Sequence, residues 1–140
     1  MTVMQLNTDF EHLIIGAGVV GLACAAELSL TSTPLLLEAE SSYGRHTSSR
    51  NSEVLHSGIY YPPDSLKARL CLEGNRRTKD WCTEHQLPCC ETGKYVVAMN
   101  EDELPRLFAL LDQGRRNGVS GLSLVKGNEL PADLAGLRPV

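Results

Sequence analysis

A glycine-rich turn between two short apolar runs constrains the fold of this 140-residue chain more than any other feature. Residues 13–15 are Leu-Ile-Ile, and residues 16–21 are Gly-Ala-Gly-Val-Val-Gly, which is the pattern G-x-G-x-x-G. An Ala-rich stretch follows at residues 22–28, and a second apolar run at residues 35–37 ends in Glu38. This order predicts strand, turn, helix, strand and carboxylate, the arrangement of a dinucleotide-binding βαβ unit.

The glycines and the acid of this motif have separate roles. Gly16 permits the turn out of the first strand, Gly18 lets a pyrophosphate approach the backbone, and Gly21 allows close packing of the helix. The amino end of the helix offers N–H groups and partial positive charge to phosphates. Glu38 would accept hydrogen bonds from ribose hydroxyls and repel a 2′-phosphate, which favours NAD or FAD over NADP. The alternative is a glycine-rich turn in an ordinary α/β domain.

Composition indicates a globular α/β protein of about one domain. Hydrophobic residues make up 42% of the chain, and the net charge is −4 without a basic stripe, which argues against a nucleic-acid partner. No apolar run is long enough to span a bilayer, and residues 1–11 resemble neither a signal peptide nor a transit peptide. Five cysteines without a secretory signal favour a reduced compartment, so we expect a cytoplasmic protein.

Four candidate metal ligands lie close together in the sequence: Cys82, His85, Cys89 and Cys90. Their spacing is not that of a standard zinc site, and no second pair of ligands follows. The end of an amphipathic helix is the favoured interpretation, so we expect no metal.

Periodicity and breaker residues predict further elements after the βαβ unit. Asp64 or Ser65 would cap a helix that runs to about Gln86. In chain order, the predicted elements are a polar loop at residues 41–53, a short strand or turn at 54–61, this helix, a strand at 93–99, a second helix from about 104 and a strand at 122–125.

The apolar positions of the two predicted helices indicate their buried faces. The first helix would bury Leu66, Leu70 and Trp81. Pro105 would lie in the first turn of the second helix, where proline is tolerated. The second helix would bury Leu104, Leu107, Phe108 and Leu111.

The segment after the glycine motif resembles a known family. Residues 46–63 are His-Thr-Ser-Ser-Arg-Asn-Ser-Glu-Val-Leu-His-Ser-Gly-Ile-Tyr-Tyr-Pro-Pro, and the resemblance covers most of the chain, from about residue 9 to residue 124. It is similar to the FAD-dependent oxidoreductases of the D-amino-acid-oxidase superfamily, and within it to the L-2-hydroxyglutarate dehydrogenases and oxidases. The core at residues 51–61 is more specific than the glycine motif. Further matching stretches lie at residues 65–71, 73–74, 92–98, 103–107 and 117–119.

The resemblance implies an α/β fold: a Rossmann-like FAD-binding βαβ unit followed by the start of a mixed α+β substrate-binding region. Residues 1–140 would form the N-terminal part of an FAD-dependent oxidoreductase domain, incomplete because family members are much longer. Within it, the βαβ unit would span about residues 9–40, a flavin-facing segment about 41–62, and the helical start of the substrate region about 63–140.

The resemblance also implies a reaction. An L-2-hydroxy acid, expected to be L-2-hydroxyglutarate, would be oxidised to 2-oxoglutarate by hydride transfer from C2 to flavin N5. Oxygen or a quinone would then accept the electrons, and a quinone-linked member would lie peripherally at a membrane. Two alternatives are a truncated, non-catalytic fragment or nucleotide-binding remnant of such an enzyme, and an NAD-binding Rossmann protein unrelated to flavin.

The family match implies roles for polar residues after Glu38. They would run under the pyrophosphate and along the flavin, although a polar surface loop is the alternative. Arg45, His46 and Arg50 are candidate contacts for a carboxylate or phosphate. The predicted cofactor-binding residues of this segment are Thr47, Ser48, Ser49, Asn51 and Ser52.

His56 is the candidate catalytic base, because histidine titrates near neutral pH and can take a hydroxyl proton. Its apolar neighbours would suit a site closed to water, but a hydrogen-bonded structural histidine is an equal alternative. Tyr60 and Tyr61 would line the pocket or pack against it. Since two strands and one helix cannot bury both faces of a Rossmann sheet, we expect marginal stability and weak or absent FAD binding for this chain alone.

Overall fold

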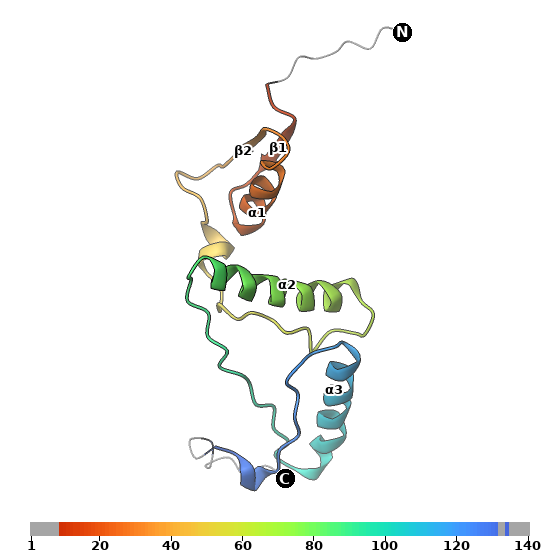
Figure 1. The fold of residues 1–140 in the computed structure, drawn as a ribbon. Helices are drawn as coiled ribbons and strands as arrows, with labels where there is room; N and C mark the ends of the chain where they lie inside the picture. Colours follow the sequence, from red (N-terminus) through yellow and green to blue (C-terminus); the bar gives the residue numbers. More distant parts are fainter. Residues whose placement is uncertain (1–8, 132–133, 135–140) are drawn as a thin grey trace, which may run out of the picture. The chain divides into compact units, whose positions relative to one another are not determined.

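The computed structural model describes residues 9–131 and Leu134, and Figure 1 shows the course of the chain. The chain divides into two compact units, Met1–Val54 and Leu55–Val140, which are treated separately below. The elements in chain order are β1 (His12–Ile15), α1 (Val19–Leu28), β2 (Pro34–Leu37), the 3₁₀ turn η1 (His46–Ser49), α2 (Leu66–Glu84), η2 (Glu101–Glu103), α3 (Leu104–Arg116) and η3 (Gly127–Glu129).

The first unit contains the predicted βαβ arrangement. Strands β1 and β2 pair in parallel, with Ile14 opposite Leu36, and α1 makes the crossover between them (Figure 1). Parallel strands need such a crossover, usually a helix, because a tight hairpin cannot connect them. The predicted strand–turn–helix–strand order is therefore confirmed.

This small sheet leaves apolar side chains exposed to solvent. Ile15 is 83% exposed, Leu13 59% and Leu37 47%. One helix can cover only one face of a parallel sheet, and parallel strands normally have both faces covered. The apolar exposure expected from the sequence is thus observed at these positions.

Helix α2 of the second unit begins where the sequence predicts. The hydroxyl of Ser65 accepts a hydrogen bond from the Ala68 amide at 3.1 Å, as an N-cap residue does. Of the two predicted N-cap residues, Ser65 is the one that caps α2. Asp64 precedes it with a positive φ of 62°.

The buried face of α2 differs from the prediction. Leu66, Leu70 and Trp81 are each more than half exposed, whereas Ala68 is buried. The reason is a close approach of backbone: a Cβ on Gly58 would lie 3.1 Å from Leu72 Cδ1 and 3.3 Å from the Ala68 carbonyl. A small residue must face this contact, so the larger apolar residues turn outward.

The segment at residues 55–61 forms a turn at its end and no strand, so the turn alternative is the observed one. Its carbonyl groups lack a neighbouring strand and need other partners. Amide side chains of α2, of α3 and of Asn117, the residue that follows α3, supply them. The bonds run from Asn75 Nδ2 to Leu55 O (3.3 Å) and His56 O (3.2 Å), from Gln113 Nε2 to Ile59 O (2.9 Å), and from Asn117 Nδ2 to Gly58 O (2.9 Å) and Tyr61 O (2.8 Å).

Helix α3 begins with Pro105 in its first turn, as predicted. Leu107 and Leu111 lie on its partly buried side, but Phe108 is 48% exposed, contrary to the prediction. The most buried residue of this helix is Gly114, whose missing side chain leaves room for Ile59 and Leu122. Close packing at Gly114, like that at Gly58, requires a residue without a side chain.

Two predicted strands are absent. Residues 93–99 and 122–125 have no assigned strand, so both predictions are wrong for the part of the chain that the structure describes. A strand requires a hydrogen-bonded neighbour, and neither segment has one among the described residues. No helix in residues 9–131 is long and apolar enough to cross a membrane.

Candidate functional site

The glycine turn of the first unit has the geometry that its sequence predicts. Gly16 has a φ of +100°, a conformation that residues with side chains rarely adopt. Its amide donates to the carbonyl of Leu37 at 2.7 Å, so the turn is tied to the end of β2. The turn thus begins at the carboxyl ends of both strands, the edge at which open parallel sheets bind ligands.

Gly18 and Gly21 both have close neighbours, and only Gly21 has backbone so near that a side chain would collide with it. A Cβ on Gly21 would collide with the carbonyl oxygen of Gly16, which confirms that this glycine allows α1 to pack closely on the turn. A Cβ on Gly18 would lie 3.1 Å from the hydroxyl oxygen of Ser48. The absence of a side chain at Gly18 therefore lets the Ser48 hydroxyl approach the backbone at the start of α1.

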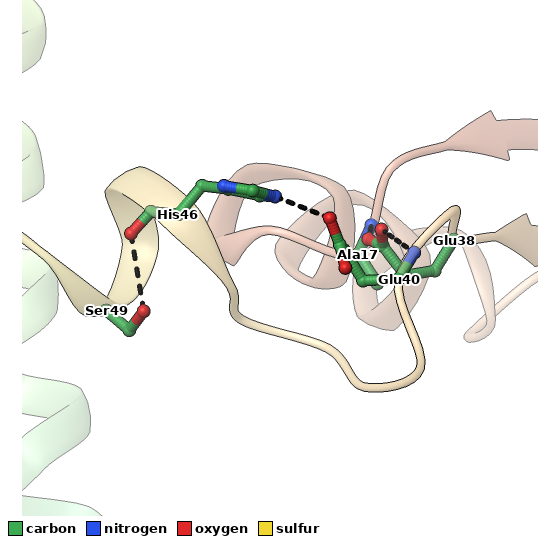
Figure 2. A network of polar contacts seen from close by, with 5 residues as sticks. All are labelled: Ala17, Glu38, Glu40, His46 and Ser49. Atoms are coloured by element: carbon green, nitrogen blue, oxygen red, sulfur yellow. Dashed lines mark hydrogen bonds and ion pairs between the residues drawn. The ribbon is translucent and has the colours of Figure 1, made fainter.

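Glu38 lies at the same edge and uses both carboxylate oxygens (Figure 2). Oε2 accepts from the Ala17 amide at 2.6 Å, and Oε1 accepts from the Glu40 amide at 2.9 Å. The Glu40 amide and then the Ala17 amide hold the pKa of Glu38 below its usual value. A carboxylate has about four acceptor positions, so Glu38 can accept further bonds from ribose hydroxyls while it orders the turn.

Ser48 connects the loop after β2 to the start of α1. Its hydroxyl oxygen accepts from the Val19 amide at 2.9 Å, although the two residues are 29 positions apart. Leu22 is the first residue of α1 to bond back along the helix, to the carbonyl of Gly18. The amides of Val20 and Gly21 precede that bond at the helix end, where backbone donors lack helical partners. This group of donors fits a pyrophosphate.

The Asn51 side chain forms hydrogen bonds with backbone groups of its own loop. Its amide nitrogen donates to the carbonyls of Thr47 (3.1 Å) and Ser48 (3.3 Å), and its oxygen accepts from the Glu53 amide at 2.8 Å. This residue shapes the loop that presents Ser48. Its binding to the cofactor, like that of exposed Thr47 and Ser52, stays a prediction.

The sequence did not reveal a second polar contact in this loop (Figure 2). His46 Nε2 lies 2.8 Å from Glu40 Oε1, and the Ser49 hydroxyl donates to the His46 carbonyl at 3.3 Å. His46 also has a positive φ of 59°, which is uncommon for a residue with a side chain. His46 therefore has a loop-ordering contact in addition to its predicted role toward an anion.

The candidate base His56 lies in the second unit, whereas the glycine turn and Ser48 lie in the first. Its carbonyl accepts from Asn75, and its side chain is exposed. The expected enclosure is not observed among the described residues. Its role as a base stays a prediction.

The second unit also has a groove that the sequence analysis missed. It has a volume of about 290 Å³ and is lined by residues that include Tyr60, Arg106 and Leu110. The Lys94 ammonium lies 4.5 Å from the centre of the Tyr60 ring. Glu103 also lines the groove, but its carboxylate accepts from the Met99 amide at 2.8 Å. Nothing in the sequence distinguishes Arg106 from an ordinary solvated arginine on a helix.

Comparison with known families confirms the predicted resemblance. Residues 11–138 match the family described as DAO, FAD dependent oxidoreductase. The chain therefore belongs to this family of FAD-dependent oxidoreductases, and FAD is the cofactor of the family.

Curated relatives point to one group within the family. A protein from Arabidopsis thaliana named "L-2-hydroxyglutarate dehydrogenase, mitochondrial" is 51% identical over 120 residues, which cover 85% of this chain and 25% of that protein. The Homo sapiens protein of the same name is 40% identical over 127 residues, covering 89% of this chain and 27% of that protein. The chain thus spans about a quarter of the length of these relatives.

A solved structure supports the predicted α/β, Rossmann-like fold class. The dithionite-reduced L-α-glycerophosphate oxidase from Mycoplasma pneumoniae, with FAD bound, matches with a TM-score of 0.61 and 30% sequence identity. The match covers 82% of this chain and 30% of that structure. The fold class predicted from the glycine motif and the family resemblance is confirmed.

Proposed function

We propose that this chain supplies the FAD-binding part of an enzyme that oxidises L-2-hydroxyglutarate to 2-oxoglutarate. The observation that carries the proposal is that Gly18, Glu38 and Ser48 lie together at one edge of the sheet. The chain is also 40–51% identical to the human and Arabidopsis proteins named L-2-hydroxyglutarate dehydrogenase.

The first unit would hold the cofactor through its adenosine diphosphate part. The amino end of α1 and the Ser48 hydroxyl would bind the pyrophosphate beside Gly18, and Glu38 would bind the ribose. Glu38 would also repel the 2′-phosphate of a phosphorylated analogue. The remaining predicted contacts, along the pyrophosphate and the flavin, are Thr47, Ser49, Asn51 and Ser52.

FAD, when bound, supplies the electron acceptor that the side chains lack, namely N5 of the flavin. His56 would take the substrate's hydroxyl proton as the C2–H bond breaks. Arg106 would suit a substrate carboxylate, because its guanidinium donates two parallel hydrogen bonds to such a group. Oxygen or a quinone would then reoxidise the flavin, and neither a nucleic acid nor a membrane span is part of the proposal.

The test is reduction of bound FAD in the natural protein that carries this sequence, followed in the visible flavin band under anaerobic conditions. We expect L-2-hydroxyglutarate to bleach this band and the D enantiomer to leave it unchanged. His56→Asn would slow bleaching without loss of FAD, whereas His85→Asn, in the same unit, would not. Retained FAD that no L-2-hydroxy acid bleaches would contradict the proposed substrate class.

A second candidate is a nucleotide-binding fragment without catalysis. It is favoured by the exposed apolar residues of β1 and β2. Such a fragment would bind FAD or its adenosine diphosphate part, weakly, and would never bleach with substrate. The same titration with and without substrate separates the two candidates.

The domain limits and the compartment are also proposals. We propose a βαβ unit at about residues 9–40, a flavin-facing segment at about 41–62, and the start of a substrate region at about 63–140. The cytoplasmic location stays a prediction, since the Arabidopsis and human relatives are named as mitochondrial. Cell fractionation of the tagged natural protein distinguishes the two compartments.

A further inference from the structure

We propose that Cys82 and Cys89 form an oxidation site, at which a small disulfide such as oxidised glutathione converts the two thiols into an intramolecular disulfide. This site lies outside the proposed cofactor and substrate sites. It rests on the geometry of the chain where it leaves α2 and turns back.

The chain reverses at the end of α2 and brings the two thiols together. Cys82 lies in the last turn of the helix, and its carbonyl accepts from the Leu87 amide at 2.8 Å. Between them, Gln86 has a positive φ of 54°, which directs the chain back. Cys89 lies two residues after Leu87, so the returning segment carries its thiol back toward Cys82.

An ion pair holds the returning segment beside the helix. Lys79 Nζ lies 2.8 Å from Glu91 Oε1. Lys79 and Cys82 are three residues apart and therefore share a helix face. Cys89 lies between Leu87, whose amide bonds to the Cys82 carbonyl, and Glu91, which pairs with Lys79. The ion pair and the thiol pair thus match each other in register.

The neighbouring cysteines do not share this register. Cys90 is exposed and follows Cys89 directly, so an extended backbone would direct its side chain to the opposite side. Cys71 lies eleven residues before Cys82 on the same helix, a rise of about 16 Å. Cys24 lies in the first unit. The 82–89 pair is therefore the favoured disulfide.

The proposed reaction is thiol–disulfide exchange. The thiolate of exposed Cys89 attacks one sulfur of oxidised glutathione, which breaks its S–S bond and releases one glutathione. The Cys82 thiolate then attacks the Cys89 sulfur of the mixed disulfide and releases the second glutathione. In sum, two protein thiols are oxidised, the glutathione disulfide is reduced, and the two thiol protons pass to solvent or to the glutathione thiolates.

The environments of the two thiols favour this order of attack. Partial burial, followed by the neighbouring Cys89, raises the pKa of the Cys82 thiol. Cys82 is therefore less often ionised before oxidation and suits the second, resolving step. Cys89 is exposed and accessible to the oxidant.

The test treats the reduced natural protein that carries this sequence with oxidised glutathione, blocks free thiols with an alkylating reagent and maps disulfides by mass spectrometry. We expect the 82–89 disulfide to form at least tenfold faster than 82–90, and Cys89→Ser to abolish the fast product. Cys90→Ser, the matched control, would leave it unchanged. Equal rates for 82–89 and 82–90 would overturn the proposal, as would equal rates in folded and urea-unfolded chain.

A second measurement tests the contribution of the ion pair. Exposed ion pairs have small energies, so Glu91→Gln should slow formation of the 82–89 disulfide by about twofold to fivefold. The exchanged pair Lys79→Glu with Glu91→Lys should restore the rate, since it reverses both charges. Equal rates in all three proteins would contradict the register on which the proposal depends.

Discussion

The two units differ in the side-chain groups that order one loop in each of them. In the first unit, side chains that carry the proposed chemistry also order the backbone: Glu38 accepts from two amides, and Ser48 accepts from the start of α1. In the second unit, the segment at residues 55–61 is held by amide side chains, chiefly Asn75 and Asn117, that donate to its carbonyls. Acceptor side chains thus order the glycine turn of the first unit, and donor side chains order residues 55–61 of the second.

This difference follows from what each backbone lacks. A turn that leads into a helix has unpaired N–H groups, which oxygen atoms satisfy. A segment without a strand neighbour also has unpaired carbonyl groups, which N–H donors satisfy. The same oxygens in the first unit suit the hydroxyls of a nucleotide, whereas the donors of the second unit are already used within the fold.

The largest expected effect is that of Gly21→Ala in the first unit. Its Cβ would collide with backbone, the Gly16 carbonyl, which cannot move without shifting β1. We expect a loss of about 3 kcal/mol or more in the stability of this unit. Hydrogen exchange at the amides of β1 and β2 measures it. Gly74→Ala is the control, because a Cβ there meets no atom within 4 Å and a helical alanine is favourable.

Asn117→Ala should have the next largest effect, in the second unit. It removes the donor to the carbonyls of Gly58 and Tyr61, and we expect a loss of about 2 kcal/mol. Asn75→Ala should cost less, because its bonds are longer and exposed. Hydrogen exchange across α3 checks the order. Equal losses for the two variants would contradict the comparison within this unit.

Gly114→Ala sharpens the contrast with Gly21. Its Cβ would lie 2.6 Å from Leu122 Cδ1 and 3.0 Å from Ile59 Cγ1, and the leucine terminus can rotate away. The gain in helix propensity offsets part of the cost, so we expect a change of less than about 1 kcal/mol. A loss as large as that of Gly21→Ala would show that the second unit is as tightly packed as the glycine turn.

The smallest expected effect is the pH dependence of the Glu38 contacts. The pKa of Glu38 in the folded chain is lowered from 4.5, so its stabilising effect is complete above that value and is lost as the pH falls through the folded value. Exchange at the Ala17 and Glu40 amides, corrected for intrinsic rates, should rise as the pH drops below 4.5. Glu38→Gln should remove this dependence, and Glu27→Gln, in the same unit, should retain it.

The sequence predicted the first unit well because its signals are local. The turn at Gly16, the close packing at Gly21 and the carboxylate after β2 all follow from short-range spacing. The contact of Ser48 with α1 spans 29 positions, and no spacing rule predicts that partner. The family resemblance predicts that Ser48 is a site residue, a role that stays a proposal, and the structure shows its hydrogen bond to the Val19 amide.

The second unit was predicted less well because its contacts depend on distant segments. The strands expected at residues 93–99 and 122–125 need neighbours that local periodicity cannot supply. The buried face of α2 is set by backbone approach at Gly58, so Ala68 faces inward and Leu70 does not. The groove beside Arg106 likewise depends on Tyr60, which is distant in sequence.

The most direct test of the account is a titration of FAD into the natural protein that carries this sequence, after removal of its bound FAD, by flavin fluorescence polarisation with nucleotides as competitors. We predict that ADP displaces FAD, that adenosine 2′,5′-bisphosphate does so poorly, and that FMN binds more weakly than FAD. Glu38→Gln and Ser48→Ala should weaken binding, and Ser42→Ala should not. FMN binding as tight as that of FAD, or binding unchanged in Glu38→Gln and Ser48→Ala, would contradict the claim that the first unit recognises the adenosine diphosphate part of the cofactor.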